Sequence, residues 1–270
     1  MILRPVGQPM EFSSEIVSAW QAVAASQEES AAACWLIAQP DHAALAGDLA
    51  AQFVANEFPA QDKDVIRAIA LHDAGWANYD GGGEAGGGRR GLIPQPLRDP
   101  EGRALSFLRA PVPVFLEAWE LSIECAEEKA GAIGGLMVSG HFRRLGEHHL
   151  ASVKDSREDA ERIHTFLEKQ ASCDEVRFSR QARSRAEVES LVDFLQFCDL
   201  LSLYLCCGSR ASVQFPPLRG GRPTVLRRRG EVCALEPSPL RAEVRLGVTA
   251  RRAPAAASEA TTSVLALVLR

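Results

Sequence analysis

Residues 187–207 (EVESLVDFLQFCDLLSLYLCC) form the segment that most restricts how this chain can fold. Its apolar residues fall on nearly every face of a helix, so we expect this helix to lie in the centre of a helical bundle. Asp199 stands within it. Because an unpaired buried carboxylate costs several kcal/mol, Asp199 must meet a cation, a metal ion or hydrogen-bond donors.

Helical patterns also precede this segment. Leu45, Leu49 and Phe53 recur four residues apart, which predicts a helix over 42–55 with Asp41 as its N-cap. An apolar stripe over 62–73 predicts a second helix. Further helices are expected over 114–129 and 133–150, and a charged helical pair over 152–190. The sequence therefore predicts a mainly α-helical domain over residues 1–209.

Two regions break the helical pattern. Residues 81–113 contain the run GGGEAGGGRRG followed by several prolines, which predicts a long mobile loop. After Gly208, β-prone pieces at 224–226, 231–235, 243–248 and 263–269 are separated by Gly and Pro. We expect residues 210–270 to form a small Arg-rich β appendage packed on the helices. These residues hold 11 Arg against 4 Glu, whereas the whole chain has a net charge of −5.

Composition narrows the class of protein. The 7 cysteines include no CxxC spacing, so neither a disulfide framework nor a thiolate zinc site is expected, and a reducing cytoplasm is the simplest location. No apolar run reaches the ~20 residues of a membrane span, and no secretory signal is visible. Nucleic acid is not an expected partner, because the basic tail has no aromatic residue beyond Phe215 for base stacking. The oligomeric state is left open.

Four places along the chain share one chemistry. His42 opens the first helix, His72 and Asp73 close the second, and Asp199 lies in the apolar helix. Imidazoles and carboxylates that converge on a divalent ion would satisfy all four places at once. Nitrogen and oxygen ligands suit Mn, Fe, Ni, Co, Zn or Mg without distinguishing among them. Neighbouring helix residues point about 100° apart, so the adjacent pair could bind one ion from two sides, or Asp73 could bridge two ions.

The order of these residues resembles the HD-domain superfamily of metal-dependent phosphohydrolases. The segments QPDHAALAG (39–47), AIALHDAGWANYD (68–80), LMVSGHFRRL (136–145) and LQFCDLLSLYLC (195–206) look like a bacterial branch of that superfamily with no established function. The resemblance extends to MILRP at the start and ALEPSPL (234–240) in the tail. It implies an HD-domain-like helical bundle in which one metal ion is ligated by His42, His72, Asp73 and Asp199.

The resemblance also bears on the number of metal ions. Superfamily members with two ions use an additional pair of histidines between the HD pair and the last aspartate. This chain has His141 at a suitable place, but His148 and His149 lie in a polar stretch that looks exposed. One ion is therefore favoured over two. His141 is then a candidate fifth ligand or a proton donor to a leaving group.

The implied reaction is hydrolysis of a small phosphate ester or nucleotide by a metal-activated water. Developing negative charge needs cations, for which Arg143 and Arg144 beside His141 are the first candidates. Arg89 and Arg90 in the glycine-rich loop are the second candidates, if that loop closes over the substrate.

Two residues after the HD pair have predicted supporting roles. Trp76 is a candidate for the wall of the substrate pocket. Asp80 is a candidate for orienting a ligand histidine from behind. The predicted catalytic set consists of Asp73, His141, Arg143 and Arg144.

Two other functional classes stay open. Some HD-fold relatives bind two irons and activate oxygen, so a non-hydrolytic di-iron oxygenase is one alternative, although it needs a fuller ligand set. The other is a binding or regulatory protein that keeps its metal for stability and meets a partner through the Arg-rich tail. Metal analysis of the purified protein separates the three classes.

Overall fold

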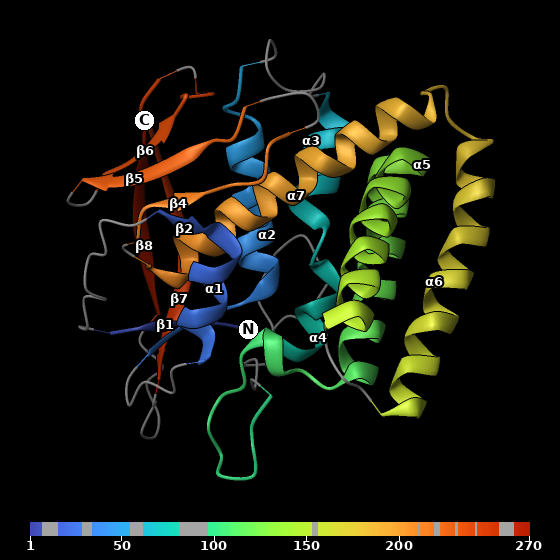
Figure 1. Ribbon diagram of the computed structural model, residues 1–270, viewed down its shortest axis with the longest axis horizontal. Helices are drawn as coiled ribbons and strands as arrows, with labels where there is room; N and C mark the ends of the chain where they lie inside the picture. Colours follow the sequence, from blue (N-terminus) through green and yellow to red (C-terminus); the bar gives the residue numbers. More distant parts are fainter. Residues whose placement is uncertain are drawn as a thin grey trace.

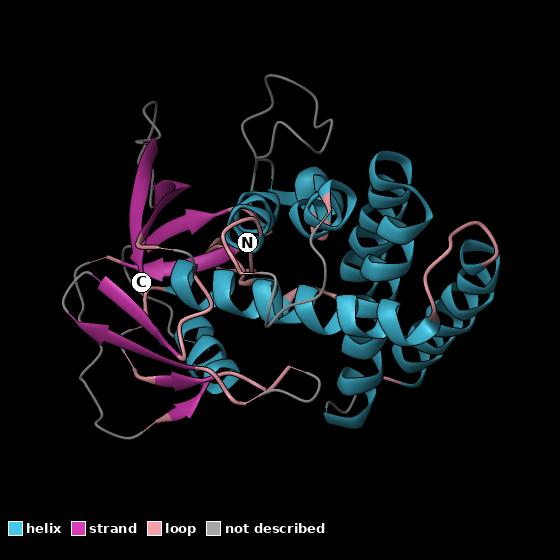
Figure 2. Cartoon of the chain, turned by 90° about the horizontal axis from the view of Figure 1, so that it is seen from above, coloured by secondary structure: helices cyan, strands magenta, loops and turns pink. Residues whose placement is uncertain are grey.

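The computed structural model describes residues 1–6, 16–28, 34–54, 62–80, 97–152, 156–209, 211–218, 222–229, 232–240, 242–253 and 262–270. A group of helices occupies one side of the molecule and a β-sheet the other (Figure 1). Viewed from above, the strands curl around the end of the helical layer (Figure 2).

In the described part of the chain, eight strands form one mixed sheet. The pairs β6–β8 and β2–β4 are parallel, and the other neighbours are antiparallel. The order across the sheet is β1 (Ile2–Pro5), β3 (Cys34–Ile37), β7 (Val244–Ala253), β8 (Thr262–Leu269), β6 (Val232–Glu236), β5 (Val225–Arg229), β4 (Val213–Gln214) and β2 (Val17–Ser18). Strands from the start of the chain therefore form both edges of the sheet.

The prediction of a mainly α-helical bundle with a small C-terminal β appendage is wrong. Three of the four residues of β3 pair with the end of β7, with Cys34 opposite Ala253, so both ends of the chain build one sheet. One hydrophobic core also contains residues from both ends, such as Ile2 and Leu269. The division of the chain into domains 1–209 and 210–270 stays a prediction.

The helices carry the rest of the core. α7 (Arg185–Cys207) packs on α2 (Gln39–Ala50), α3 (Lys63–Leu71) and α5 (Val112–Ser152), and α3 also packs on α2 and α5. α1 (Ala19–Glu28) packs on α7 and β1, and α6 (Arg157–Phe178) covers α5 from outside. A 3₁₀ turn leads from α3 into the short α4 (Ala77–Asp80). The sequence patterns predicted neither α1 nor the short α4.

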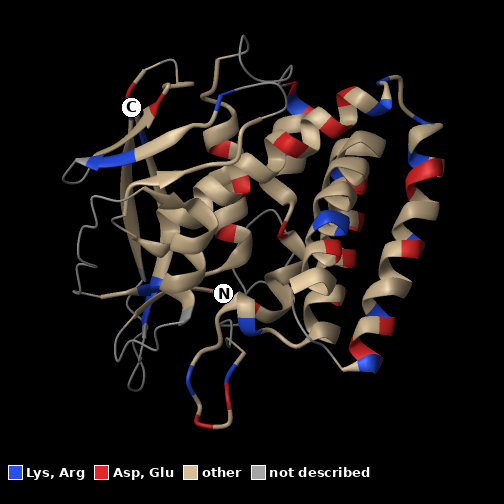
Figure 3. Cartoon of the chain, in the orientation of Figure 1, with Lys and Arg blue, Asp and Glu red and all other residues tan. Residues whose placement is uncertain are grey.

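α6 has the charged surface that its sequence predicts. Acidic and basic side chains recur along it (Figure 3), and ion pairs join Arg157 to Glu161 and Arg162 to Glu158, four residues apart. Solvated pairs of this kind contribute a few tenths of a kcal/mol each, so the stability of α6 comes mainly from its inner face. Ile163 and Phe166 on that face are buried against the core.

α5 is a helical hairpin rather than one straight rod. Gly131 has φ 72°, a conformation that favours glycine, and it separates two helical halves. The halves lie antiparallel, because Trp119 stacks on Phe142 with ring centroids 4.9 Å apart. The structure thus confirms the two helices expected over 114–129 and 133–150. His141 lies in the second half.

α7 lies at the centre of the molecule, as its apolar sequence predicts. Ser184 and Glu187 form a capping box at its start, and Gly208 with φ 70° ends it. By length and composition α7 is also apolar enough to cross a membrane, and 72% of that apolar window is buried inside the structure. The buried central helix of a globular domain meets the same criteria of length and apolarity.

A close contact between α2 and α3 sets the spacing of the two histidines. A Cβ atom added at Gly47 would lie 2.5 Å from the Cβ of Ala70, well inside van der Waals distance. The two helix backbones therefore approach at a point where neither can carry a larger side chain. Five residues before Gly47 stands His42, and two residues after Ala70 stands His72.

We predict that Gly47→Ala lowers the free energy of unfolding by about 1–3 kcal/mol, because the added methyl group overpacks this contact. Urea denaturation measures the loss. The double variant Gly47→Ala with Ala70→Gly tests the cause, since removal of the opposing methyl group relieves the overlap. If the double variant recovers no stability, and the effects of the two substitutions are simply additive, overpacking is not the cause.

Candidate metal centre

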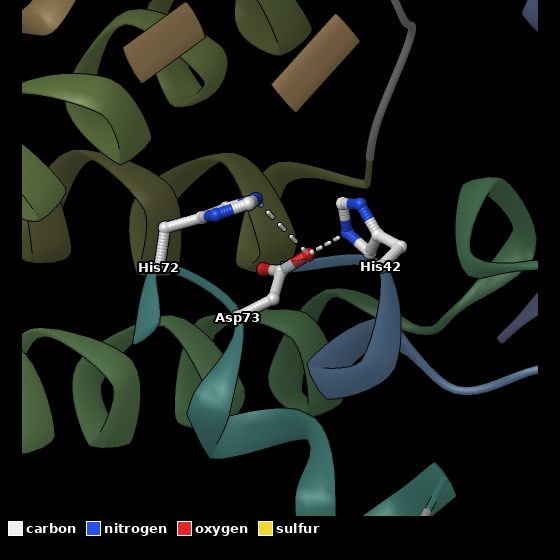
Figure 4. A group of neighbouring side chains, drawn as sticks. All are labelled: His42, His72 and Asp73. Carbon is white, nitrogen blue, oxygen red and sulfur yellow. Dashed lines mark hydrogen bonds and ion pairs between the residues drawn. The ribbon is translucent and has the colours of Figure 1, made fainter. Parts of the chain in front are cut away.

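Four elements bring the predicted ligands to one place. His42 lies in α2, His72 caps the end of α3 with Asp73 behind it, and Asp199 lies in α7. His141 reaches the same place from α5. The side chains of His42 and His72 are fully buried. Figure 4 shows Asp73 between the two histidines.

His42 is held in one orientation by a serine. Its Nδ1 lies 2.9 Å from Ser202 Oγ, and Ser202 donates its own hydroxyl proton to the carbonyl oxygen of Asp199 at 2.8 Å. Ser202 Oγ therefore accepts a hydrogen bond from Nδ1–H of His42. The lone pair of Nε2 then faces Asp73 Oδ2 at 2.8 Å. A buried nitrogen lone pair beside a carboxylate needs a cation between them.

His72 is oriented in the same way by the backbone. Its Nδ1 donates to the carbonyl oxygen of Ile69 at 2.7 Å. Its Nε2 lies 3.2 Å from Asp199 Oδ1 and 3.7 Å from Asp73 Oδ2. Nε2 of His42 is thus directed at Asp73, and Nε2 of His72 at Asp199 and Asp73. Metal-binding histidines are held in this way in proteins, with the other ring nitrogen engaged by a hydrogen bond.

The spacing of the donor atoms fits a metal ion. Bonds of about 2.1 Å place neighbouring ligand atoms about 3.0 Å apart in octahedral geometry and about 3.4 Å apart in tetrahedral geometry. The histidine–carboxylate distances of 2.8 to 3.8 Å lie close to these values. Two overlapping groups have donor atoms within 4.8 Å of one another, namely His42–His72–Asp73 and His72–His141–Asp199.

Electrostatics couples the members of this cluster. Burial lowers the pKa of His72, but the charges of Asp73 and Asp199 outweigh it and raise the pKa to about 9. Burial raises the pKa of Asp199, and the hydrogen bond and charge of His72 outweigh this and lower it to about 2. Without a metal, one proton on His72 therefore holds the carboxylates together. A divalent ion would replace that proton.

His141 differs from the other two histidines. Burial lowers its pKa to about 4, so its ring is neutral at pH 7. Its Nε2 lies 3.8 Å from Asp199 Oδ2, and its Nδ1 has no hydrogen-bond partner among the described residues. A neutral imidazole can ligate a metal ion or accept a proton. It is not the imidazolium that would donate a proton to a leaving group at pH 7.

Asp80 is buried but does not orient a histidine. Its Oδ2 accepts from the amino group of Met1 at 2.8 Å and from the backbone N–H of Gln39 at 3.1 Å. Asp80 therefore fixes the first turn of α2, three residues before His42. This contact differs from the supporting role that the sequence predicted for it.

Gly75 lets the His72–Asp73 turn lie directly on α5. A Cβ atom at Gly75 would lie 2.0 Å from the carbonyl oxygen of Ala118, a contact that no side chain can make. The backbone N–H of Gly75 donates to Ser122 Oγ at 2.9 Å. The position of Asp73 is thus fixed against the same helix hairpin that carries His141.

A cavity of about 350 Å³ opens beside the cluster. Asp73, His141 and Asp199 lie in its wall, and no Lys or Arg does so among the described residues. Most of the other lining residues are aromatic or aliphatic: Trp20, Trp76, Phe107, Leu108, Ala110, Phe115, Trp119, Phe142, Leu145 and Leu203, with Gln39, His148, His149 and Ser152 as polar members. Trp76 therefore lines the cavity, as the sequence predicted.

The predicted phosphate-binding arginines face elsewhere. Arg143 pairs with Asp174 at 3.2 Å, and Arg144 pairs with Asp193 at 2.7 Å and also with Glu189. Neither arginine lines the cavity. Arg89 and Arg90 lie outside the described residues. A role for any of the four in catalysis stays a prediction, and the positions of Arg143 and Arg144 do not support it.

Sequence reasoning missed several residues of this site. Ser202, which holds His42, is an unremarkable residue within the apolar helix pattern. Phe115, Trp119 and Phe142 have the spacing of ordinary core residues. His148 is exposed, as its polar sequence predicts, and His149 is half-buried, yet both also line the cavity. The polar residues of the segment EHHLAS (147–152) do not indicate that its histidines line a cavity.

Comparison with known proteins gives one match. A family described as a protein of unknown function (DUF3891) matches residues 26–254. The chain belongs to the DUF3891 family. No curated protein and no solved structure matches it. The region matched to DUF3891 includes every residue of the His/Asp cluster, together with α2, α3, α5 and α7.

We predict that the purified protein binds one divalent ion and that Asp199→Asn weakens this binding at least about tenfold, because a charged oxygen ligand is lost. Titration of the metal-free protein with Mn²⁺ or Zn²⁺ measures the affinity. Asp193→Asn is the matched control, since Asp193 lies on the same helix but pairs with Arg144. Equal affinities for the two variants contradict the proposed ligand set.

We also predict that the metal-free protein loses stability as the pH rises from about 6.5 to about 9. The pKa of His72 is about 9 in the folded state and 6.5 as its ordinary value, so the folded state binds the extra proton in this range. Its stabilising effect is complete below pH 6.5. Urea denaturation across this range measures the decline, and His72→Gln is expected to flatten it. A slope that His72→Gln leaves unchanged contradicts the assignment.

Proposed function

We propose that this DUF3891 protein is a metal-dependent hydrolase of small phosphate esters, similar in its chemistry to the HD-domain phosphohydrolases that its motifs resemble. The observation that carries the proposal is the orientation of His42 and His72. Both have Nδ1 engaged and Nε2 directed at Asp73 and Asp199, beside a cavity large enough for a small molecule.

His42, His72, Asp73 and Asp199 would hold the ion. A divalent ion bound there would lower the pKa of a bound water toward ~7 and polarise a phosphoryl oxygen. Two carboxylates offset its charge, and the buried histidines keep the site rigid. The low-polarity surroundings strengthen each of these interactions compared with water.

The residues around the cluster have separate tasks. His141 is neutral at pH 7, so it can ligate the ion or accept a proton from a water in the cavity. The aromatic wall keeps bulk water away from the cluster and binds the organic part of the substrate. Among the described residues the cavity has no basic side chain, so the ion itself would supply the positive charge there.

A second candidate function is the di-iron oxygenase. The observation in its favour is the pair of overlapping ligand groups that share His72, beside a largely apolar cavity. Such a cavity suits an uncharged substrate. Two irons per chain in the protein as purified, with no phosphatase activity, would favour this candidate over the hydrolase.

We predict that Asp73→Ala abolishes phosphatase activity while the fold survives, because the cluster loses the carboxylate that lies between His42 and His72. Hydrolysis of p-nitrophenyl phosphate with added Mn²⁺ measures activity, and circular dichroism measures folding. Asp193→Asn again serves as the control and is expected to keep full activity. An Asp73→Ala variant that hydrolyses as fast as the parent rules out the hydrolase assignment for this site.

A further inference from the structure

We propose that the substrate of this site is a phosphate monoester of an elongated, uncharged, apolar alcohol, and that the organic part of this substrate lies along α5. The inference rests on the proposed function for the phosphoryl end of the ligand only. The fit of the organic part depends on the length, the lining and the charge of the cavity, and it does not require hydrolysis.

One face of α5 gives the cavity its length. His141 lies beside the cluster, and the lining residues that follow it on α5 recur at helical spacing, namely Leu145, His148, His149 and Ser152. Residues with this spacing lie on one side of a helix. At a rise of about 1.5 Å per residue, the segment from His141 to Ser152 spans about 16 Å. The cavity is therefore elongated, with the cluster at its inner end and Ser152 at its outer end.

Aromatic rings line this length without a break. Phe142 contacts His141 and stacks on Trp119, with ring centroids 5.0 and 4.9 Å apart. Trp119 contacts Phe115, and Phe115 contacts His149, with centroids 4.6 and 5.4 Å apart. This row of rings extends from the cluster to the outer end of the cavity, so an apolar group of the ligand has packing partners along its whole length.

The volume of the cavity agrees with an elongated occupant. An apolar cavity of about 150 Å³ holds benzene, so about 350 Å³ holds an organic group of roughly twice that size. Trp20 and Leu108 line the cavity and are each 39% exposed, and they are two of the five large hydrophobic side chains exposed in the described part of the chain. Exposed apolar side chains beside a cavity mark where an apolar ligand enters.

The charges of the wall restrict the organic part to an uncharged group. Asp73 and Asp199 lie at the inner end, and the cavity has no Lys or Arg among the residues that the structure describes. His148 and His149 lie about 10–12 Å beyond His141 along α5. A second phosphate or a carboxylate close to the phosphoryl group would therefore lie among apolar side chains with no cation beside it, at a high cost in solvation. Nucleoside diphosphates and triphosphates are poor substrates on this argument.

Non-hydrolysable phosphonates test the length and the charge without any need for activity. Calorimetry on the Mn²⁺-saturated protein measures the dissociation constants of methylphosphonate, pentylphosphonate, octylphosphonate and 4-phosphonobutanoate. Each buried CH₂ group strengthens binding by up to roughly fourfold. We therefore expect at least about tenfold tighter binding from methyl to pentyl, and at least about tenfold again from pentyl to octyl. 4-Phosphonobutanoate ends in a carboxylate, so we expect it to bind at least about tenfold more weakly than the pentyl compound.

Ala110→Phe tests where the chain of the ligand lies. Ala110 lines the cavity, and Phe115, five residues further on, contacts His149, so Ala110 lies near the outer end. A phenyl ring at this position should reduce the affinity for octylphosphonate to about that for pentylphosphonate, and leave the affinities for the two shorter compounds unchanged. Ala151→Phe is the matched control, because Ala151 is exposed on α5 and lies outside the cavity wall.

Several results overturn the inference. They are equal affinities for methylphosphonate and pentylphosphonate, a gain that stops at pentyl, a carboxylate bound as tightly as the alkyl chain, an octyl gain that Ala110→Phe leaves unchanged, and no binding of any phosphonate. If Ala110→Phe does not fold, the order of affinities of the wild-type protein decides.

Failure of this inference and failure of the proposed function give different results. Methyl phosphate, pentyl phosphate and octyl phosphate hydrolysed with equal kcat/KM, together with equal affinities of the phosphonates, would leave the hydrolase standing and remove the elongated apolar substrate. Phosphonates that bind in the expected order, while no phosphate ester is hydrolysed, would remove the hydrolase and leave the apolar binding cavity.

Discussion

The buried carboxylate of Asp199 is the constraint on which the rest of the structure depends. α7 is apolar on nearly all sides and fills the centre of the molecule, so the Asp199 side chain is only 13% exposed to water. His72 from one helix and His141 from another lie beside it. Asp73 adds a second acid and His42 a third imidazole, so the group as a whole needs a cation. A proton on His72 provides it in the simplest state of the protein, and a divalent ion would take its place.

The cluster depends equally on groups that never touch an ion. Ser202 and the carbonyl oxygen of Ile69 fix which nitrogen of each histidine is free. Gly47 and Gly75 let three backbones approach more closely than any side chain would permit. These contacts explain how α2 and α3, although they are short helices, hold His42 and His72 in fixed positions. They also explain why the site can lie deep in the protein and still border a cavity.

The sequence predicted which of these side chains lie together better than it predicted the fold. The four candidate ligands were recognisable because an acid in an apolar helix and an adjacent His-Asp pair are chemically unusual. The structure brings all four together, and their binding of a metal ion stays a prediction. The sheet was missed at its N-terminal side because β1 and β3 are four residues long, and because β3 pairs with β7, more than two hundred residues away. Arg143 and Arg144 were assigned by their nearness to His141 in sequence, which could not reveal that Asp174 of α6 and Asp193 of α7 pair with them outside the cavity. The aromatic wall of the cavity has the same pattern as ordinary core and could not be distinguished from it.

The position of β8 has a consequence for how the molecule is assembled during synthesis. β8 pairs with β7 on one side and with β6 on the other, although it follows both in the chain. Every helix that carries a ligand of the cluster precedes residue 210, whereas a chain that ends before Thr262 leaves β6 and β7 with unpaired edges. Open edges of this kind attract other strands, including those of neighbouring chains. β8 therefore covers the edges of β6 and β7 at the same time, and a chain without it would expose both edges to aggregation.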